Sequence, residues 1–262
     1  MKHQARKRFG QHFLHDQYIL TQLVNALRLK PEDNLVEIGP GKGALTHHLL
    51  AHLPSFHVIE IDRDLIPILQ NITEPHRLTI HNVDALKFDF TPLASSDRPL
   101  RVVGNLPYNI STPLLFHLFQ YVSIIQDMHF MLQKEVVDRM VAEPNNKRYG
   151  RLSVMSQYHC NITKLFDVNP EAFDPPPKVD SAILRLTPHS TSFTVNSYAD
   201  FSKIVAQCFN QRRKTIRNSL KSFLDATQIE QLGIDPQVRA ENLSLEQFIA
   251  LANVYSSFCA ST

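Results

Sequence analysis

The sequence predicts an α/β fold: a doubly wound, mostly parallel sheet with an antiparallel edge hairpin, followed by a small all-helical C-terminal domain. Three observations predict this fold. Strand-like and helix-like segments alternate through the first half of the chain, as they do where helices cover both faces of a parallel sheet. Two strand-like segments then follow one another with no clear helical pattern between them. After Pro188, a polar segment leads into residues that show helical patterns only.

The alternating segments can be assigned in chain order. Apolar residues at helical spacing predict a first helix over 17–29, which the breaker "KPEDN" ends. The apolar runs that follow indicate buried strands separated by helical segments. Strands are predicted over 34–39, 56–62, 77–86, 100–105 and 123–133, and short helices over 43–53 and 64–72.

The pattern changes after these segments. Residues 149–162 and 181–188 predict the two strands of the antiparallel edge hairpin. The polar stretch "HSTSFTVNS" resembles a linker, so the predicted domains are 1–190 and 191–262. Helices are predicted in the second domain over 201–211, 215–224, 226–233 and 245–258.

Composition excludes several classes of protein. The chain has neither a run of about 18 apolar residues nor an apolar N-terminal stretch, so we expect a cytoplasmic protein without a membrane span or a secretory signal. Cys160, Cys208 and Cys259 are widely spaced and form no C-x-x-C pair, which argues against a disulfide framework and a structural zinc site. The formal net charge of +2 is too small to indicate a nucleic-acid partner by itself.

Positive charge is concentrated in two segments. The N-terminus is basic, and residues 201–221 hold six Lys or Arg but no Asp or Glu. Either segment alone could be a solvated face, but the two together favour contacts with RNA phosphates. The candidate RNA-binding residues are Arg6, Lys7, Arg8, Arg212, Arg213, Lys214 and Arg217.

A glycine-rich turn follows the first predicted strand of the sheet. In "VEIGPGKGALT", Gly39 and Gly41 let the backbone turn sharply and approach a ligand at the carboxyl end of the strand. The spacing G-x-G-x-G differs from the G-x-G-x-x-G fingerprint of dinucleotide-binding proteins. Glu60 and Asp84 end the next two strands, where they could bind ribose hydroxyls and an adenine amino group. Each feature alone also fits a structural turn or a surface carboxylate, but together they predict an adenosine-containing ligand.

The residues Asn105, Leu106, Pro107 and Tyr108 stand where a further buried strand ends, at the same edge of the sheet. The amino nitrogen of adenine is a poor nucleophile, because its lone pair is delocalised into the ring. The side-chain oxygen of Asn105 and the carbonyl of Leu106 could accept its two N–H bonds and favour a pyramidal nitrogen. Pro107 would orient that carbonyl and Tyr108 would stack on the base. The alternative is a turn with a buried tyrosine.

A rigid proline run lies between the two predicted hairpin strands. In "AFDPPPKVDSAIL", the extended segment could hold Phe173 over the same ligand as a second stacking wall. The alternative is a stiff connection with a core phenylalanine. The sequence contains no H-E-x-x-H, G-x-S-x-G or G-x-x-x-x-G-K-[ST] motif. It therefore predicts no metalloprotease-type metal site, no serine nucleophile elbow and no P-loop for nucleoside triphosphates.

Taken together, these motifs resemble the ribosomal RNA adenine N6,N6-dimethyltransferases of the small subunit, the kasugamycin-sensitivity family. The resemblance runs along nearly the whole chain. It is carried by "RKRFGQHFL", "VEIGPGKGALT", "VIEID", "VDAL", "GNLPYNIS", "FDPPPKVDSA" and "NQRRKTIRNSL". Resistance methyltransferases that act on large-subunit RNA share the glycine loop and the N-x-P-Y motif, whereas "PPPKVDSA" and "RFGQ" favour the small-subunit group.

The resemblance implies an enzyme with a Rossmann-like methyltransferase domain and a helical RNA- or ribosome-binding domain. It implies transfer of methyl groups from S-adenosylmethionine to N6 of two adjacent adenosines in a hairpin loop near the 3′ end of 16S rRNA, late in small-subunit biogenesis. The implied partner is 16S rRNA within the subunit, and we expect a monomer with no metal and no membrane contact. The implied cofactor-binding residues are His12, Leu14, Gly39, Gly41, Glu60, Asp84 and Asn105; the implied catalytic residues are Asn105, Leu106, Pro107, Tyr108 and Phe173.

One departure and two alternatives remain. The family most often carries Asn where this chain has His12, although histidine can also donate or accept a hydrogen bond. An enzyme with the same chemistry could act on large-subunit RNA or on DNA, and mapping the methylated base would separate these. A non-catalytic ribosome-assembly or RNA-binding factor could also keep the fold, but such a protein has no reason to retain Glu60, Asp84 and Asn105 together.

Overall fold

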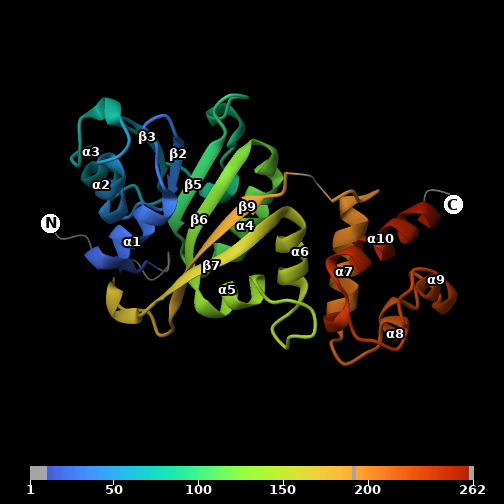
Figure 1. The fold of residues 1–262 in the computed structure, drawn as a ribbon. Helices are drawn as coiled ribbons and strands as arrows, with labels where there is room; N and C mark the ends of the chain where they lie inside the picture. The colour runs from blue at the N-terminus through green and yellow to red at the C-terminus, as the bar shows by residue number, and fades with distance from the viewer. Residues whose placement is uncertain (1–10, 191–192, 260–262) are drawn as a thin grey trace. The chain divides into compact units, whose positions relative to one another are not determined.

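The computed structural model describes residues 11–190 and 193–259, which form two compact units (Figure 1). Unit 1 comprises Met1–Val137 with Thr163–Pro188, and unit 2 comprises Asp138–Ile162 with His189–Thr262. The predicted domain boundary near residue 190 lies close to the point where the chain finally leaves unit 1, between Pro188 and His189. Residues 138–162, however, were assigned to the first domain and belong to unit 2. They do so because their helix packs on the C-terminal helices, with the rings of Tyr158 and Phe201 4.7 Å apart.

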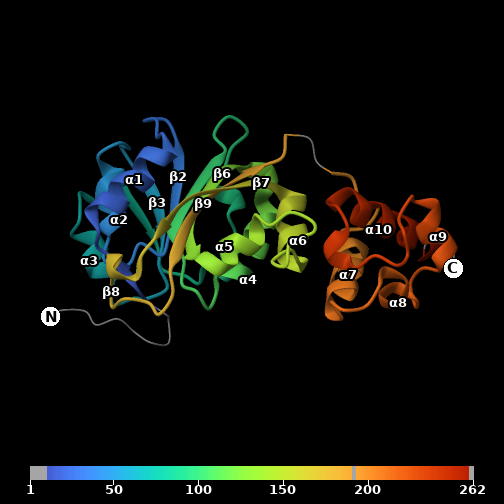
Figure 2. The same cartoon turned by 60° about the horizontal axis from the view of Figure 1, so that its bottom comes forward.

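Unit 1 is built on a seven-stranded sheet with the order β4-β3-β2-β5-β6-β9-β7. Five strands are parallel: β2 (Asn34–Ile38), β3 (Phe56–Ile59), β4 (Leu78–His81), β5 (Leu100–Asn105) and β6 (Ile125–Gln133). β9 (Ser181–Pro188) pairs antiparallel with β6, and β7 (Cys160–Val168) lies at the edge beyond it (Figure 2). The mostly parallel sheet with antiparallel strands at one edge is therefore confirmed.

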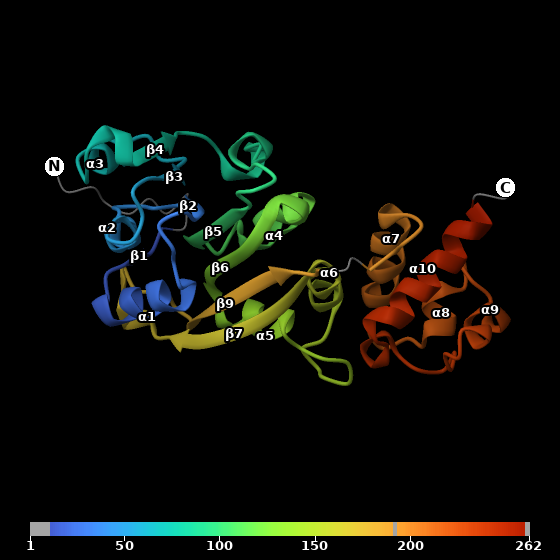
Figure 3. The same ribbon diagram turned by 45° about the horizontal axis from the view of Figure 1, so that its top comes forward.

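Helices cover both faces of this sheet (Figure 3). Val103 and Met131 join α1 and α2 in one buried core. Because side chains alternate along a strand, Val102 and Phe130 face the opposite side, where α4 packs. The helices of unit 1 are α1 (Gln17–Leu27), α2 (Ala44–Leu50), α3 (Ile66–Gln70), α4 (Ser111–Leu118) and the start of α5 (Lys134–Met140).

Local signals set the ends of α1. Asp16 caps its first turn, since its carboxylate accepts hydrogen bonds from the amides of Tyr18 and Ile19. The helix stops where Arg28 adopts a left-handed conformation with φ of 49°. Asp33 then accepts a hydrogen bond from the Lys30 amide in the turn that leads into β2.

Residues 149–162, predicted as a hairpin strand, instead form α6 (Arg151–His159) and the first residues of β7. The Gly150 amide donates to the Ser153 hydroxyl at the start of the helix, and Val154 and Met155 are fully buried. A short apolar run fits either a helix or a strand, so its pattern could not separate the two. The edge strand that accompanies β9 is β7.

Unit 2 is built mainly of helices, as expected for the C-terminal part of the chain. Its core is formed where α7 meets α10, and includes the fully buried Phe201, Val205 and Phe248. Ser197 caps α7 by accepting a hydrogen bond from the Asp200 amide. The remaining helices of this unit are α7 (Tyr198–Asn210), α8 (Ile216–Leu220), α9 (Ala226–Gln231) and α10 (Leu245–Cys259).

The cysteines and the lengths of the helices complete the description of the fold. Cys160 and Cys208 are buried and form no disulfide, and burial raises the pKa of both thiols to about 12. Within residues 11–190 and 193–259, no helix has both the length and the apolar character needed to cross a membrane.

Candidate active site

A cavity of about 450 Å³ opens at the carboxyl ends of the parallel strands. Parallel strands end at the same edge of a sheet, so residues far apart in the sequence meet there. All seven predicted cofactor-binding residues line this cavity: His12, Leu14, Gly39, Gly41, Glu60, Asp84 and Asn105. Of the remaining predicted catalytic residues, Leu106, Pro107 and Tyr108 line it as well.

Glu60 connects the glycine loop to the end of β3. Its two carboxylate oxygens accept hydrogen bonds from the Gly41 amide at 3.2 Å and the Asp62 amide at 2.8 Å. Burial raises the pKa of Glu60, while these two hydrogen bonds act in the opposite direction. Gly41 has a φ of 58°, a left-handed conformation that favours glycine, and a Cβ atom there would make a tight contact of 3.0 Å with the Phe13 ring. The carboxylate therefore holds the loop in place beside the cavity.

Asp84 occupies the corresponding position after β4. It caps the short 3₁₀ helix η3 (Ala85–Lys87), with Oδ1 accepting a hydrogen bond from the Leu86 amide at 3.0 Å. Both Asp84 and Leu86 line the cavity. The carboxylate is thus fixed at the wall with one oxygen engaged by the backbone.

The N-terminal motif reaches the cavity through a short two-stranded sheet. β1 (Phe13–Leu14) pairs antiparallel with β8 (Phe173–Asp174). Just before β1, Nδ1 of His12 lies 2.7 Å from the carbonyl oxygen of Pro175, which is 163 residues away in the sequence. Because a carbonyl only accepts, this contact places the proton on Nδ1. Sequence spacing could not show this pairing.

His12 also contacts both polar side chains of the N-L-P-Y segment. Its carbonyl oxygen accepts a hydrogen bond from Nδ2 of Asn105 at 2.9 Å. Its ring stacks on Tyr108, with centroids 5.6 Å apart and an angle of 28° between the planes. The Tyr108 hydroxyl lies 2.6 Å from the hydroxyl of Ser181, and burial raises the pKa of Tyr108. These contacts fix the Asn105 amide and the Tyr108 ring.

Two oxygen atoms at the end of β5 accept no hydrogen bond from the described residues. Since Nδ2 of Asn105 is directed at His12, its Oδ1 has no hydrogen-bond partner in the part of the chain that the structure describes. The Leu106 amide donates to the Met131 carbonyl at 3.2 Å, and the Leu106 carbonyl accepts from no described residue. Leu106 is only 1% exposed, so its contribution to the cavity wall is small and comes from a restricted part of the residue.

Phe173 does not line this cavity. It is 2% exposed and belongs to the buried core that contains Leu14 and Ile183. Its neighbour Asp174 lines the cavity instead. Successive residues of an extended segment face opposite sides, so the strand pairing that directs Asp174 outward directs Phe173 into the core. In this structure Phe173 therefore forms no part of the cavity wall, and its stacking role stays a prediction.

Glu37 is a cavity residue that the sequence analysis did not assign. It lies in β2 directly before the glycine loop and is 2% exposed. Burial raises its pKa to about 8, the hydrogen bond from the Thr46 hydroxyl at 2.7 Å opposes this, and repulsion from Glu60 adds to it. The available signal was a carboxylate in an otherwise apolar strand, because an unpaired buried charge is costly. Ser181, which holds Tyr108, had no comparable signal.

The Glu37→Gln substitution is expected to remove a pH dependence of stability. With a pKa of about 8 in the folded state and an ordinary value in the unfolded chain, Glu37 binds its proton more tightly when folded. The folded state therefore holds more protons, and the free energy of unfolding falls as pH rises through this window. From about pH 6 to about pH 8, this group should account for a loss of about 2 kcal/mol. Urea unfolding of both proteins measures it.

Glu32→Gln is the matched control, because Glu32 is exposed. It should keep the pH dependence of the wild type. If the wild type and the Glu37→Gln variant lost the same stability between these pH values, a neutral Glu37 carboxyl would be ruled out.

The predicted RNA-binding residues fall into three groups. Arg6, Lys7 and Arg8 lie outside the described residues. Arg212 is engaged within unit 2, where it donates to the carbonyls of Lys147 at 2.7 Å and Tyr149 at 3.2 Å. Arg213, Lys214 and Arg217 are exposed.

No group of three His, Cys, Asp or Glu side chains within residues 11–190 and 193–259 is arranged to hold a metal ion. The two adjacent histidines of α2 are also not placed to share a metal ion. His47 and His48 are adjacent on α2, and residues adjacent in sequence do not share a helix face.

Comparison with known proteins agrees with this geometry. A family model described as ribosomal RNA adenine dimethylase matches residues 2–257. Two relatives are named ribosomal RNA small subunit methyltransferase A. The one from Alcanivorax borkumensis is 55% identical over 254 residues, 97% of this chain and 91% of the relative. The one from Saccharophagus degradans is 57% identical over 253 residues, 96% of this chain and 94% of the relative.

Two solved structures share the fold over most of their length. A dimethyladenosine transferase from Plasmodium falciparum has a TM-score of 0.81 at 27% identity, covering 94% of this chain and 98% of that one. The 23S rRNA methyltransferase ErmE has a TM-score of 0.71 at 24% identity, covering 93% of this chain and 99% of that one. The second likeness shows the fold alone.

Proposed function

Because the chain belongs to the ribosomal RNA adenine dimethylase family, we propose that it methylates two adjacent adenosines near the 3′ end of 16S rRNA. Each adenosine sits in a hairpin loop and receives two methyl groups on N6, late in assembly of the small subunit. The names of the relatives support the small-subunit target. The observation that carries the proposal is the meeting of Asn105 and Tyr108 with the glycine loop in one cavity.

The cavity fits a cofactor that contains adenosine. Glu60 has acceptor capacity beyond its two backbone hydrogen bonds, which suits ribose hydroxyls. Asp84 engages the backbone through Oδ1, so its other oxygen suits an adenine amino group. Gly39 and Gly41 allow close approach of the ligand to the loop. S-adenosylmethionine, when bound here, would supply an electrophilic methyl group.

Asn105 and Leu106 would orient the target amine. With Nδ2 of Asn105 fixed on the His12 carbonyl, its Oδ1 can accept one N–H of the adenine amino group. The Leu106 carbonyl would accept the other. The two acceptors would draw the lone pair out of conjugation, so that no strong base is needed to begin the reaction.

Tyr108 would stack on the base. His12 covers one face of its ring, and centroids 5.6 Å apart leave no room for a base between the two rings. The adenine would therefore use the other face of Tyr108. A loop base suits this site, because it is already partly unstacked and costs less to present than a paired base.

Exposed cations of unit 2 would bind the RNA backbone. Arg213, Lys214 and Arg217 are exposed, as phosphate contacts require, whereas Arg212 is engaged by backbone carbonyls. We propose that unit 2 docks on the ribosomal subunit, with the protein acting as a monomer in the cytoplasm. Arg6, Lys7 and Arg8 are also proposed to bind RNA phosphates.

His12→Ala is expected to lower kcat/KM for methyl transfer about tenfold, the equivalent of about 1.4 kcal/mol. The substitution removes the hydrogen bond to Pro175 and the ring that supports Tyr108. His15→Ala is the matched control, since His15 also lines the cavity but is exposed, and it should change the value less than threefold. Equal effects of the two substitutions would contradict the positioning role of His12.

The function is tested by transfer of labelled methyl groups to small subunits that lack the modification. The wild-type protein should label two adjacent adenosines near the 3′ end of 16S rRNA, which sequencing of the labelled RNA would map. Small subunits already modified and isolated large subunits are the controls and should stay unlabelled. Absence of label in the unmodified small subunits, or label in large-subunit RNA, would overturn the proposal.

A further inference from the structure

A second cavity, of about 430 Å³, lies at the amino ends of the parallel strands of unit 1, at the other end of the sheet from the candidate active site. Residues at the beginnings of β2, β5 and β6 line it, including Asn34, Arg101 and Asp127. The end of α1 and one residue of β9, Arg185, complete the wall. None of these residues lines the candidate active site.

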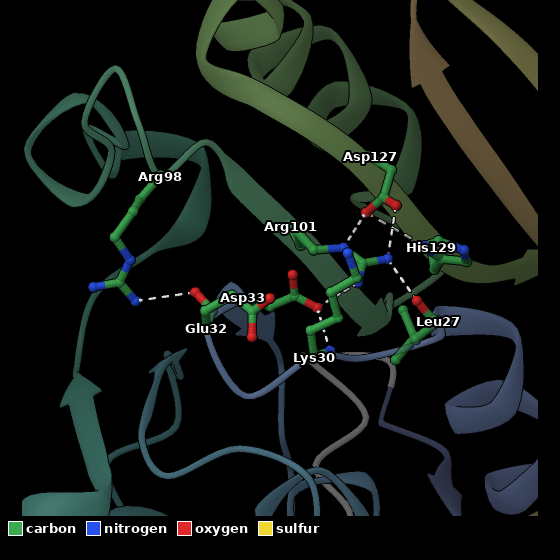
Figure 4. Close-up of polar contacts among 8 residues, drawn as sticks. All are labelled: Leu27, Lys30, Glu32, Asp33, Arg98, Arg101, Asp127 and His129. Atoms are coloured by element: carbon green, nitrogen blue, oxygen red, sulfur yellow. Dashed lines mark hydrogen bonds and ion pairs between the residues drawn. The ribbon is translucent and has the colours of Figure 1, made fainter.

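The base of this cavity is a closed ion cluster centred on Arg101 (Figure 4). Its guanidinium donates to both carboxylate oxygens of Asp127 at 3.0 and 2.7 Å, to Asp33 at 2.6 Å and to the Leu27 carbonyl at 2.6 Å. The charge of Arg101 is therefore neutralised by two carboxylates. Four of its five N–H donors are engaged by these residues.

His129 lies beside this cluster and has no partner for its ring. It is 1% exposed, lines the cavity, and neither ring nitrogen has a hydrogen bond within the described residues. Figure 4 shows it next to Asp127, whose Oδ1 is 3.8 Å from Nδ1, too far for a hydrogen bond. Buried polar groups are almost always paired. The unpaired imidazole can therefore bind a group that enters the cavity.

The environment keeps this imidazole neutral. Burial lowers the pKa of His129 to about 4, the Asp127 carboxylate opposes this, and Arg101 and Arg185 add to it. A neutral ring offers one N–H donor and one acceptor. The donor suits an anionic oxygen.

The rim of the cavity carries more cations than carboxylates. Arg28, Lys30 and Arg185 are exposed, and their side chains have no partner among the described residues, while Arg98 makes one long hydrogen bond of 3.4 Å to the Glu32 carbonyl. Two carboxylates face these four cations, those of Glu32 and Asp97, and Asp97 already accepts a hydrogen bond from Ser95.

Arg185 lies directly opposite His129 in the sheet. The two residues are direct partners in the antiparallel ladder of β6 and β9, and such partners have their side chains on the same face. A group that bridges them would meet a guanidinium and an imidazole together.

We propose that this cavity binds a phosphate group, with Arg185 and His129 as its main contacts and Arg28 and Arg98 at the rim. A phosphate supplies two oxygens for the fork of a guanidinium and a third for the imidazole N–H. The same chemistry is offered by a small molecule that carries a phosphate and by an RNA phosphodiester. The site does not depend on the proposed methyl transfer.

The test is a titration of the full-length protein with inorganic phosphate, followed by nuclear magnetic resonance of the histidine rings. The His129 signals, assigned by comparison with a His129→Gln variant, should shift and saturate. Arg185→Gln, which changes an exposed residue, should weaken binding at least about tenfold, the loss of a charge-assisted contact. Arg151→Gln, an exposed arginine on α6 of unit 2, should bind as the wild type does. Absence of saturation, or equal binding by Arg185→Gln, would overturn the proposal.

A second measurement distinguishes the two sources of phosphate. If the group belongs to RNA, Arg185→Gln should weaken binding to small subunits and reduce the slope of log affinity against log salt by about one. If the group belongs to a small molecule, the variant should lose phosphate binding and keep the wild-type affinity and slope for subunits. Unchanged binding of both phosphate and subunits would leave the cavity without a ligand and refute the site.

Discussion

Asn105→Ala is expected to lower the rate constant of methyl transfer by about 100- to 1,000-fold, the range seen when one preorganised polar group is removed from an active site. The substitution deletes the oxygen that would accept an amine N–H. It also deletes the amide that holds the His12 carbonyl at 2.9 Å, so the stack of His12 on Tyr108 would loosen. Single-turnover transfer of labelled methyl groups to unmodified small subunits measures the rate.

Asn109→Ala is the matched control for this substitution. Asn109 lies four residues further on, also lines the cavity and is exposed. It should retain the wild-type rate within about threefold, as expected for the substitution of an exposed side chain. A rate for Asn105→Ala that matched the Asn109→Ala control would refute the assignment of Asn105 to catalysis. Circular dichroism of both variants separates this from unfolding.

Arg101→Met is expected to lower the free energy of unfolding by about 3–5 kcal/mol, the cost of removing one partner from a buried ion pair. Arg101 is 5% exposed. Its loss would leave the Asp33 and Asp127 carboxylates without a counter-charge and the Leu27 carbonyl without a donor. Urea unfolding followed by circular dichroism measures the change.

Arg98→Met is the matched control, three residues earlier in the chain. Arg98 is exposed, and its side chain makes one hydrogen bond of 3.4 Å to the Glu32 carbonyl among the described residues, so its replacement should change stability by less than about 0.5 kcal/mol. Adding Asp33→Asn and Asp127→Asn to Arg101→Met should recover part of the loss, because the uncompensated charges are then removed. A loss below about 1 kcal/mol for Arg101→Met would show that the buried pair is not needed.

The parts of the fold that were predicted correctly have strong local patterns. The strand over residues 100–105 is an apolar run followed by a turn signal, and its predicted bounds match β5 (Leu100–Asn105). Repeated alternation of strand and helix leaves few topologies other than a parallel sheet. Residues 151–159 form a helix where the sequence predicts a strand. Val154 and Met155 are buried by helix packing, and a short apolar run does not distinguish a buried helix from a buried strand.

The part of the candidate site that lies at the ends of the parallel strands could be predicted from the sequence. Glu60 and Asp84 follow strands and Asn105 ends one. The carboxyl ends of parallel strands meet on one side of the sheet, so local sequence was enough to group the three residues. The burial of Phe173 could not be predicted, because the side of the segment on which it lies depends on the register with Leu14. Glu37 was missed because its effect comes from burial, which alters the pKa only in the folded chain.

By itself, the sequence determined the class of fold, the edge of the sheet that carries the candidate site and the resemblance to a family. Those properties follow from short-range patterns and from motifs within a few residues of one another. Only the tertiary structure decided that His12 is held between Pro175, Asn105 and Tyr108, and that His129 is buried without a partner beside Arg101. Such contacts join residues distant in sequence, and their energies depend on solvent exclusion that exists only after folding.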